Sequence, residues 1–283
     1  MKDFKRDVAA LGTCNMDFIM KVPRFIGAED EADVQLLLES PGGSAANFAR
    51  ETSRLGLKTG ILACVGNDHF GSLITQNFQM EGVDTERLLS LDEKTGMGFI
   101  AVDPRGERSI YTFMGANAQF SVHPEDVSYI ESSRILHITG VYVEVLEEAS
   151  NHANTLSLNP GTLLSYYGWN ILKKVIKKSD VLFLNRKELE LLTGNDRDEG
   201  AQFLLDEGVP LVILTGGKDG AAAYTEEGSI KVPTKKVGAV DTTGAGDAFA
   251  AGFISSWIKN QGLEECLKKG NQIASQCVQR FGG

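Results

Sequence analysis

The segment DVLFLNRKELELLTGNDRDEGAQFLLDEGVPLVILTGG, residues 180–217, has the pattern of a strand, a helical stretch and a second strand. Its apolar runs, residues 180–185 and 210–217, are short and continuous, as buried parallel strands are. Between them, residues 197–208 carry apolar side chains at helical spacing and end on a glycine. The segment therefore predicts two parallel strands joined by a crossover helix.

The same alternation recurs along the whole chain. Other apolar runs that fit buried strands are residues 8–12, 59–66 and 134–140, and other stretches of helical spacing are residues 45–56, 71–82 and 169–178. This order predicts one α/β domain over residues 1–283, with a doubly wound, mostly parallel sheet flanked by helices. In such a sheet, ligands bind at the carboxyl ends of the strands.

Two stretches, residues 18–40 and 98–113, interrupt the alternation. The first contains candidate strands at 18–25 and 33–40, and the second is a hairpin around Asp103-Pro104-Arg105-Gly106. Because both adjoin motif residues, we predict a small β-sheet lid over the site rather than an independent domain. Apolar strands in this lid also invite pairing between subunits, so a homodimer through the lid is a hypothesis.

Composition narrows the classes of partner. The 28 Lys and Arg residues against 38 Asp and Glu residues give a net charge of −10, which argues against a nucleic-acid partner. The four cysteines lack CxxC spacing and fit small buried residues in a reducing compartment. The polar N-terminus and the lack of any long apolar run predict a cytoplasmic protein with no membrane partner. The ending RFGG, with no closing element after it, suggests a missing or shortened C-terminal tail.

The strongest chemical signal is DTTGAGD, residues 241–247, followed by AFAAGFISSWI. Phe249, Phe253 and Trp257 recur every four residues, so a helix should begin near 244–247. Its free N–H groups and dipole, next to two glycines, would make an anion hole for a transferring phosphoryl group. Asp247 on the same turn is a candidate base that the helix terminus should keep ionised at neutral pH, or else an ordinary helix cap.

At these residues the chain resembles the ribokinase-like (PfkB) carbohydrate kinases. DTTGAGDAFAAGF, residues 241–253, resembles their C-terminal signature, and PGGSAAN, residues 41–47, resembles their N-terminal one. The resemblance runs from about Gly12 to the last residue. It implies an α/β sandwich with a β-sheet lid, ATP as phosphoryl donor, Mg²⁺ and, in many members, a monovalent cation such as K⁺.

The resemblance also implies roles for single residues. Asp247 would be the catalytic base beside an anion hole formed by Gly244, Ala245 and Gly246. The acceptor would be bound by Asp17, Gly42, Gly43 and Asn47. Without the resemblance, Asp17 fits a loop turn, and Ser44 fits the cap of a helix that begins after the two glycines.

A second group of residues would serve the nucleotide and cations. Asn185 and Glu188 resemble the element that orders Mg²⁺ and its waters, although a helix start with Glu at its third position gives the same letters. Thr215, Gly217 and Gly220 would lie near ATP. The spacings of a Walker loop and of a GxGxxG dinucleotide loop are absent. Asp241 and Thr243 match half of the monovalent-cation loop, but residues 277–283 match its other half only in part, which leaves K⁺ open.

Four further residues are weaker candidates. His137 resembles a cleft position of nucleoside-using relatives, but a lone histidine on an apolar strand also fits a core residue. Arg105 and Arg108 in the lid hairpin could reach a substrate, although a solvated turn fits them better. Glu144 could meet a sugar hydroxyl.

Together these features predict a kinase that transfers a phosphoryl group from ATP to a hydroxyl of a sugar of the ribose or fructose type, with Asp247 as base. Two alternatives stay open: a nucleoside kinase of the same fold, and a non-catalytic sensor that binds sugar or nucleotide. The intact Asp247 and anion hole argue against the sensor.

Overall fold

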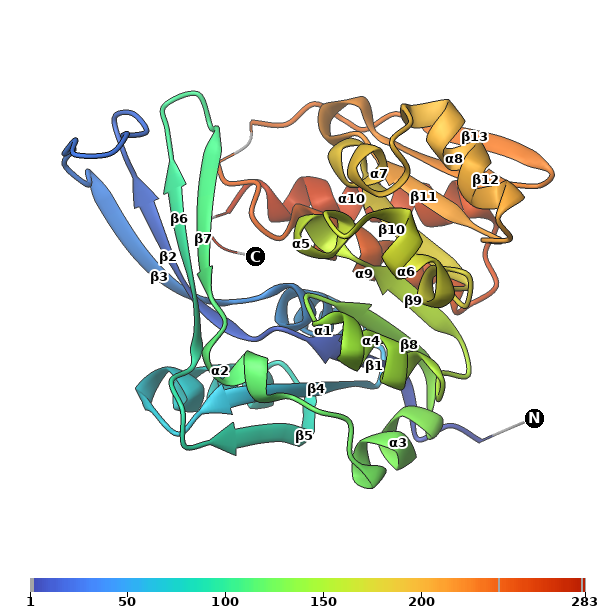
Figure 1. Ribbon diagram of the computed structural model, residues 1–283, viewed down its shortest axis with the longest axis horizontal. Helices are drawn as coiled ribbons and strands as arrows, with labels where there is room; N and C mark the ends of the chain where they lie inside the picture. Colours follow the sequence, from blue (N-terminus) through green and yellow to red (C-terminus); the bar gives the residue numbers. More distant parts are fainter. Residues whose placement is uncertain (1–2, 239, 281, 283) are drawn as a thin grey trace.

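A computed structural model describes residues 3–238, 240–280 and 282, and in these residues it shows two sheets of unequal size (Figure 1). The large sheet has nine strands in the order β13-β12-β11-β10-β9-β8-β1-β4-β5 within the described part of the chain. Its strands are parallel apart from β12, which runs antiparallel to both neighbours. The strands are β1 (Arg6–Gly12), β4 (Thr59–Gly66), β5 (Asp84–Leu91), β8 (Ser133–Thr139), β9 (Leu156–Asn159), β10 (Val181–Asn185), β11 (Val212–Thr215), β12 (Ala221–Thr225) and β13 (Gly228–Val232). The predicted fold class is confirmed.

Helices cover both faces of this sheet and enclose two cores. Side chains alternate along β1, so that Val8 and Ala10 face one core while Ala9 and Leu11 face the other. The first core is closed by α1 (Ser44–Arg54), α2 (His69–Met80), α9 (Ala245–Trp257) and α10 (Leu263–Cys277). The second is closed by α3 (Pro124–Glu131), α4 (Val143–Ser150), α5 (Gly161–Ser165), α6 (Gly168–Ile176), α7 (Arg186–Thr193) and α8 (Arg197–Asp206). Short 3₁₀ turns lie at Gly115–Gln119 and Gly217–Asp219.

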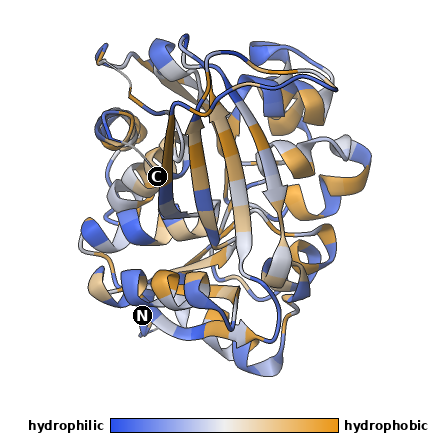
Figure 2. Cartoon of the chain, turned by 90° about the vertical axis from the view of Figure 1, so that its left-hand side faces the viewer, coloured by the Kyte–Doolittle hydropathy of each residue, from blue (hydrophilic) through white to orange (hydrophobic). Residues whose placement is uncertain are grey.

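The small sheet stands at one end of the molecule and forms the lid (Figures 1 and 2). Its order is β3 (Leu36–Gly42), β2 (Asn15–Lys21), β6 (Gly96–Val102) and β7 (Arg108–Phe113). Strand β2 pairs antiparallel with β3 and parallel with β6, and the predicted hairpin joins β6 to β7. The sheet extends beyond the range 18–40 expected from the sequence, because β2 begins at Asn15 and β3 ends at Gly42. Asp17 therefore lies inside a lid strand, not in a loop.

The sequence pattern located the long apolar strands of the large sheet best. Strand β4 has the predicted bounds, whereas the run predicted at 18–25 ends as a strand at Lys21. The pattern missed β5, β12 and β13, which lie toward the two edges of the large sheet, and the four-residue strand β9, which lies inside it. All four cysteines are buried and free. No helix in the described residues combines the length and apolar character that crossing a membrane requires.

Candidate active site

One hydrogen bond brings the two signature motifs together. Nδ2 of Asn47 donates to Oδ2 of Asp247 over 3.1 Å, across 200 residues of sequence. Asn47 lies in the first turns of α1, and Asp247 lies in the first turn of α9. Both side chains are buried, with 4% and 8% of their surface exposed. The motifs at residues 41–47 and 241–247 thus form one site.

The start of α9 leaves room for an anion. Gly244 is the N-cap with a left-handed φ of 72°, a conformation that glycine adopts without strain, and no side chain caps this helix end. A Cβ added at Gly246 would meet no atom within 4 Å, so the turn has open space beside it. Asp247 is not the helix cap, since its carboxylate accepts from Asn47 instead.

The protonation of Asp247 differs from the expectation drawn from the helix terminus. The pKa of Asp247 is raised to about 7, chiefly by burial and in smaller part by the negative charges of Glu188 and Asp17. The hydrogen bond from Asn47 and the positive charge of Arg50 lower the pKa but do not cancel the effect of burial. The expectation that this carboxyl is fully ionised at neutral pH is therefore corrected: its protonated and ionised forms coexist there.

Asp17 sits in a space that only glycines leave open. It is paired with Gly98 in the register of β2 and β6, and a Cβ at Gly98 would lie 2.4 Å from Oδ1 of Asp17. A Cβ at Gly42 would lie 1.9 Å from Oδ2 of Asp17. Burial also raises the pKa of Asp17 to about 7, against the lowering effect of Arg50. Two buried carboxyl groups therefore line this part of the site.

Gly43 has a separate, conformational reason to be glycine. It is the N-cap of α1, with a φ of 95°, and a Cβ there would lie 2.5 Å from the backbone oxygen of Thr13. Ser44 is the first residue of α1 and does not cap it; its N–H donates to Oγ1 of Thr13 over 3.3 Å. The two glycines thus hold the end of the lid strand β3 close to the end of β1.

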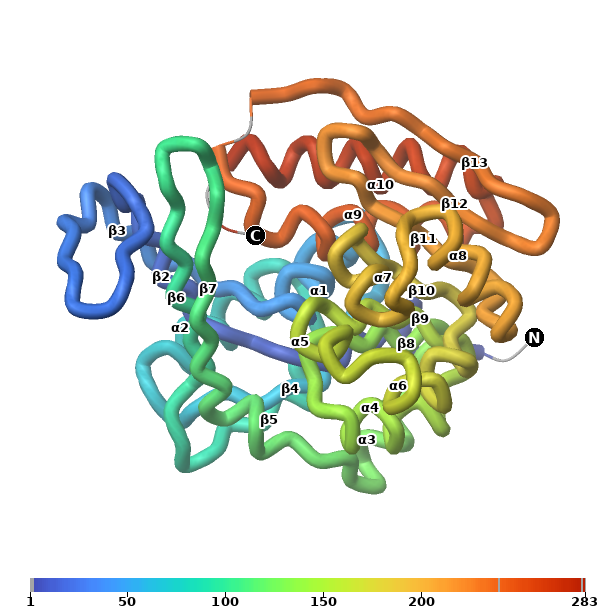
Figure 3. Tube along the Cα trace, turned by 45° about the horizontal axis from the view of Figure 1, so that its top comes forward, coloured from blue at the N-terminus to red at the C-terminus, as the bar shows by residue number. Residues whose placement is uncertain are grey.

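The lid contributes an arginine to the loop before α9. Nη1 of Arg108 on β7 donates to Oγ1 of Thr243 over 3.4 Å, whereas Arg105 pairs with Asp103 at 2.9 Å within the hairpin turn. Both arginines are exposed, which agrees with the solvated position favoured from the sequence. Arg108 differs from Arg105 only in this one contact with Thr243, which its place on a strand rather than in the turn allows. Figures 1 and 3 show the hairpin beside the segment that leads into α9.

The residues predicted for a monovalent cation form a closed turn. Oδ1 of Asp241 accepts from N–H and Oγ1 of Thr243 over 2.9 and 2.7 Å. Oδ2 of Asp241 accepts from the N–H of Gly282 over 3.1 Å, so the C-terminal residues do approach this loop. Phe281 and Gly283, which belong to the partly matched half of the cation loop, lie outside the described residues.

A cavity of about 300 Å³ lies at the carboxyl ends of β10 and β11. Of the predicted nucleotide residues, Asn185, Thr215 and Gly217 line it. Its wall also holds Asp219 and three cationic side chains that the sequence pattern did not point to: Arg186, Lys187 and Arg197. This excess of positive charge in a chain of net charge −10 fits a polyphosphate ligand.

Gly220 does not line this cavity, and the conformation of the backbone explains why this residue is a glycine. Its φ is 89°, and a Cβ there would lie 2.1 Å from the carbonyl oxygen of Val232. The structure therefore shows Gly220 as a turn residue between η2 and β12.

Asn185 and Glu188 form a helix capping box at the start of α7. The N–H of Glu188 donates to Oδ1 of Asn185, and the N–H of Asn185 donates to Oε2 of Glu188, both over 2.9 Å. Oε1 of Glu188 accepts only a long bond of 3.4 Å from Oγ1 of Thr162 among the described residues, and burial raises the pKa of Glu188. A buried carboxylate with one weakly engaged oxygen fits a nearby hydrated Mg²⁺, which would favour its ionised form.

His137 belongs to the core and not to the cleft. It is fully buried, its Nδ1 lies 2.7 Å from Oγ of Ser157, and its ring stacks on Phe48 with centroids 3.7 Å apart. Burial lowers the pKa of His137 to about 3, so it stays neutral. The core interpretation of this residue holds. Glu144, in the first turn of α4, is exposed.

With this geometry in place, similarity to known proteins identifies the family. The model of the pfkB family of carbohydrate kinases matches residues 5–283. The chain belongs to this family. It is therefore a phosphotransferase that acts on an alcohol group.

Individual relatives of this pfkB-family chain differ in their acceptors. An ATP-dependent ribose-1-phosphate kinase of Halopiger xanaduensis is 31% identical over 280 residues, which cover 97% of this chain and 93% of that protein. A nucleoside kinase of Methanothermobacter thermautotrophicus is 29% identical, with 98% of this chain and 91% of the relative covered. The crystal structure of a ribokinase from Thermotoga maritima is 28% identical, with a TM-score of 0.87 and coverage of 97% and 93%.

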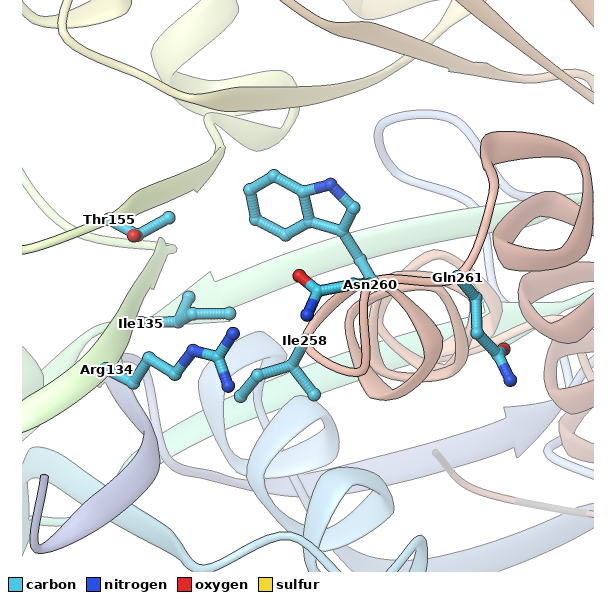
Figure 4. Close-up of a pocket in the computed structure, with 7 residues that line it drawn as sticks. Arg134, Ile135, Thr155, Ile258, Asn260 and Gln261 are labelled. Carbon is cyan, nitrogen blue, oxygen red and sulfur yellow. The ribbon is translucent and has the colours of Figure 1, made fainter. Parts of the chain in front are cut away.

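The pfkB-family chain has another cavity, of about 290 Å³, at the amino ends of the strands of the large sheet (Figure 4). It lies at the amino ends of β8 and β9 and beyond the last residue of α9, and Arg134, Thr155 and Asn260 are part of its wall. None of the predicted site residues lines it. The chemistry of the two motifs therefore belongs to the carboxyl ends of the strands.

Substitution of Gly42 tests the position of Asp17. In Gly42→Ala the new Cβ displaces the Asp17 carboxyl, since the two would lie 1.9 Å apart. We expect the KM for the acceptor to rise about 10-fold or more, because a displacement of this size can cost two orders of magnitude. The affinity for ATP, measured by calorimetry, should not change. Gly27→Ala is the control, because a Cβ at Gly27 would meet nothing within 4 Å. An unchanged KM in Gly42→Ala would show that Asp17 does not contact the acceptor.

Proposed function

We propose that this pfkB-family protein transfers the γ-phosphoryl group of ATP to a primary hydroxyl of a sugar, with Asp247 as the base. The observation that carries the proposal is the hydrogen bond of 3.1 Å between Asn47 and Asp247. It places a candidate base, an amide that can bind hydroxyls and the start of α9 within one buried site. A sensor needs no base at the mouth of an anion hole.

In this proposal Asp247 accepts the proton of the attacking hydroxyl. A carboxylate whose pKa is raised to about 7 is a better proton acceptor than an ordinary aspartate, yet it is still partly ionised at neutral pH. Asp17 and Asn47 would hold the acceptor through its hydroxyl groups, with Gly42 and Gly43 giving the backbone a close approach. Phosphoryl transfer depends mainly on such positioning.

The other half of the proposal concerns charge on the phosphates. The first turn of α9, at Gly244, Ala245 and Gly246, would stabilise the charge that develops on the transferring group. The nucleotide would be attracted by the cationic side chains of the cavity at the ends of β10 and β11, which are Arg186, Lys187 and Arg197. Thr215 and Gly217 would lie beside it. Arg108 would add a positive charge from the lid.

Mg²⁺ would lie near Asn185 and Glu188, and when bound it would neutralise charge on the phosphates of ATP. Asp241 and Thr243 are proposed to face a monovalent cation such as K⁺. These assignments are supported by the position of each side chain at the same edge of the sheet. Removal of free divalent cations with a chelator should abolish turnover.

The acceptor is proposed as a sugar, and two features favour including phosphorylated sugars and nucleosides among the candidates. The similar proteins of Halopiger xanaduensis and Methanothermobacter thermautotrophicus are a ribose-1-phosphate kinase and a nucleoside kinase. In addition, Arg108 brings a cation from the lid to the cleft, where it could meet an anionic acceptor.

The decisive experiment measures ADP release from Mg-ATP with ribose, fructose, 2-keto-3-deoxygluconate, ribose 1-phosphate, adenosine, cytidine and inosine as acceptors. We expect one class to be turned over, and Asp247→Asn to lower kcat by about 10²- to 10⁴-fold, the range for loss of a general base. Asp206→Asn, at an exposed aspartate that ends α8, is the charge-matched control and should keep most of the rate. Binding of ATP or sugar without turnover in the wild type would favour the sensor instead.

The pH dependence follows from the two buried carboxyl groups. Burial raises the pKa of Asp247 and of Asp17 to about 7 each, and the base acts only when ionised, so kcat/KM should rise with pH through this region. The measurement is a profile from about pH 5 to about pH 9 for the wild type and for Asp17→Asn. Asp17→Asn should keep a rising acidic limb, because Asp247 still titrates. A flat wild-type profile would contradict the role of Asp247.

We also propose that two copies pair through the lid. Leu37 and Tyr111 lie on one face of the lid in the strand register, their exposed fractions are 54% and 73%, and β3 is an edge strand. Burying such side chains against a second copy is favourable, so sedimentation should show a dimer at micromolar concentration. Leu37→Lys with Tyr111→Lys should yield monomers. Met80→Lys, at an apolar residue on α2 that is 79% exposed, is the control. A monomeric wild type would exclude pairing under these conditions.

A further inference from the structure

A buried arginine lies behind the candidate base, outside both signature motifs. Arg50 is in α1, three residues after Asn47, so the two side chains share one face of the helix. Only 4% of the surface of Arg50 is exposed. Burying a guanidinium is unfavourable unless hydrogen bonds replace its water, so the contacts of this side chain show what holds it there.

Those contacts tie together three segments around the acceptor site. Nη2 of Arg50 donates to Oδ1 of Asn47 over 2.6 Å and to the backbone oxygen of Pro41 over 3.0 Å. Nη1 donates to Oδ1 of Asn77 on α2 over 3.4 Å. Pro41 immediately precedes the two glycines that hold β3 against β1. Arg50 thus links the glycine turn to Asn47 from the buried side.

The chemistry of arginine decides which way the Asn47 amide faces. A guanidinium has donors and no acceptor, so the amide atom that faces Arg50 must be the oxygen. The other amide atom is then the nitrogen, and it donates to Oδ2 of Asp247 over 3.1 Å. The assignment of amide oxygen and nitrogen, which is often ambiguous, is fixed here by the neighbour.

We propose that Arg50 is a positioning residue that locks Asn47 as a hydrogen-bond donor to Asp247 and so favours the ionised form of the base. Arg50 does not contact the reacting atoms. Without it, the amide could turn and present its oxygen to Asp247, an arrangement that requires a protonated carboxyl. The inference rests on the proposed role of Asp247, which it extends to the residue that controls it.

The charges around Asp247 agree in sign with this role. Burial raises the pKa of Asp247, and Glu188 at the start of α7 and Asp17 on β2 raise it through their negative charges. Asn47 and Arg50, both on α1, lower it. Two further titratable groups lie near Asp247: Cys277 at the end of α10 and Asp241 in the loop before α9. Both are buried. Loss of Arg50 would remove both lowering influences together, the charge directly and the donor through Asn47.

The test follows the Asp247 carboxyl itself, by carbon NMR of protein labelled at the aspartate carboxyls, with Asp247→Asn to assign the signal. In Arg50→Gln the midpoint of its titration should rise by about one pH unit, the lower end of the effect of a nearby cation. Arg50→Lys should restore most of the wild-type midpoint, because an ammonium group is also only a donor. Arg54→Gln is the matched control from the same helix, since Arg54 pairs with Glu51 and Glu81 instead. A wild-type midpoint in Arg50→Gln, or equal shifts in Arg50→Gln and Arg50→Lys, would overturn the proposal.

Turnover gives a second readout. Below the midpoint, Arg50→Gln should lose about 10-fold in kcat/KM, and the loss should vanish at high pH, where the base is ionised in both proteins. An equal loss at every pH would indicate a structural role only and would overturn the proposal. If the wild type turns over no acceptor, the proposed function fails, but the NMR titration still decides the role of Arg50.

If Arg50→Gln does not fold, the wild type alone is informative. The side-chain NH₂ signals of Asn47, assigned with Asn47→Ser, should shift with the same midpoint as the Asp247 carboxyl. Amide protons that do not respond to this titration would mean that Asn47 does not donate to Asp247, and the proposal would be wrong.

Discussion

The hydrogen bond between Asn47 and Asp247 joins the two halves of the chain at the point where chemistry is proposed. It forms because α1 and α9 pack side by side on the same face of the sheet, with Phe48 of α1 and Phe249 and Phe253 of α9 in one core. The first turns of both helices then open at the same edge, next to the end of β1. Packing of apolar side chains thus sets the distance between two polar ones.

Burial at this junction has an electrostatic consequence. Asp17 and Asp247 are both buried, and the pKa of each carboxyl is raised chiefly because burial excludes water from it. The same exclusion that makes Asp247 a stronger base works against its ionised form. Arg50, which lowers the pKa of both carboxyls, moderates this conflict from the buried side. On the proposed function, the site would therefore depend on a buried cation as well as on its acids.

Much of this arrangement is legible in the sequence, and the rest depends on tertiary contacts. Runs such as residues 59–66 are apolar on both sides and locate a buried strand from local pattern alone. The DTTGAGD segment also predicts its own helix start, because glycine spacing and helical period are local properties. The exposed strand β13 has four exposed residues of five, so no apolar run marks it.

In the candidate site, too, local features could be predicted from the sequence, and features that depend on tertiary contacts could not. The sequence predicted that Asn47 and Asp247 share one site, but not that the pKa of Asp247 rises to about 7, since burial is a property of the folded chain. It did not single out Arg50, which looks like any charged residue of a surface helix until Asn47 and Pro41 are placed around it. Arg186, Lys187 and Arg197 were missed because they come from α7 and α8 and converge only at the nucleotide cavity.

The lid divides the proposed roles between two bodies of structure. Asp17 and Arg108 lie on β2 and β7 of the small sheet, while Asn47 and Asp247 lie on helices of the large layer. On the proposed function, the side chains that hold the acceptor and the lid cation therefore arrive together, whereas the base stays with the anion hole. On that proposal the acceptor would meet Asp247 only when the lid lies against the loop before α9, where Arg108 contacts Thr243. Because Gly42 and Gly98 enclose the Asp17 carboxyl within the lid sheet itself, that carboxyl would keep its place in the lid if the sheet moved. Binding of the acceptor would then coincide with exclusion of water from the site, which would favour a sugar hydroxyl over water as the attacking group.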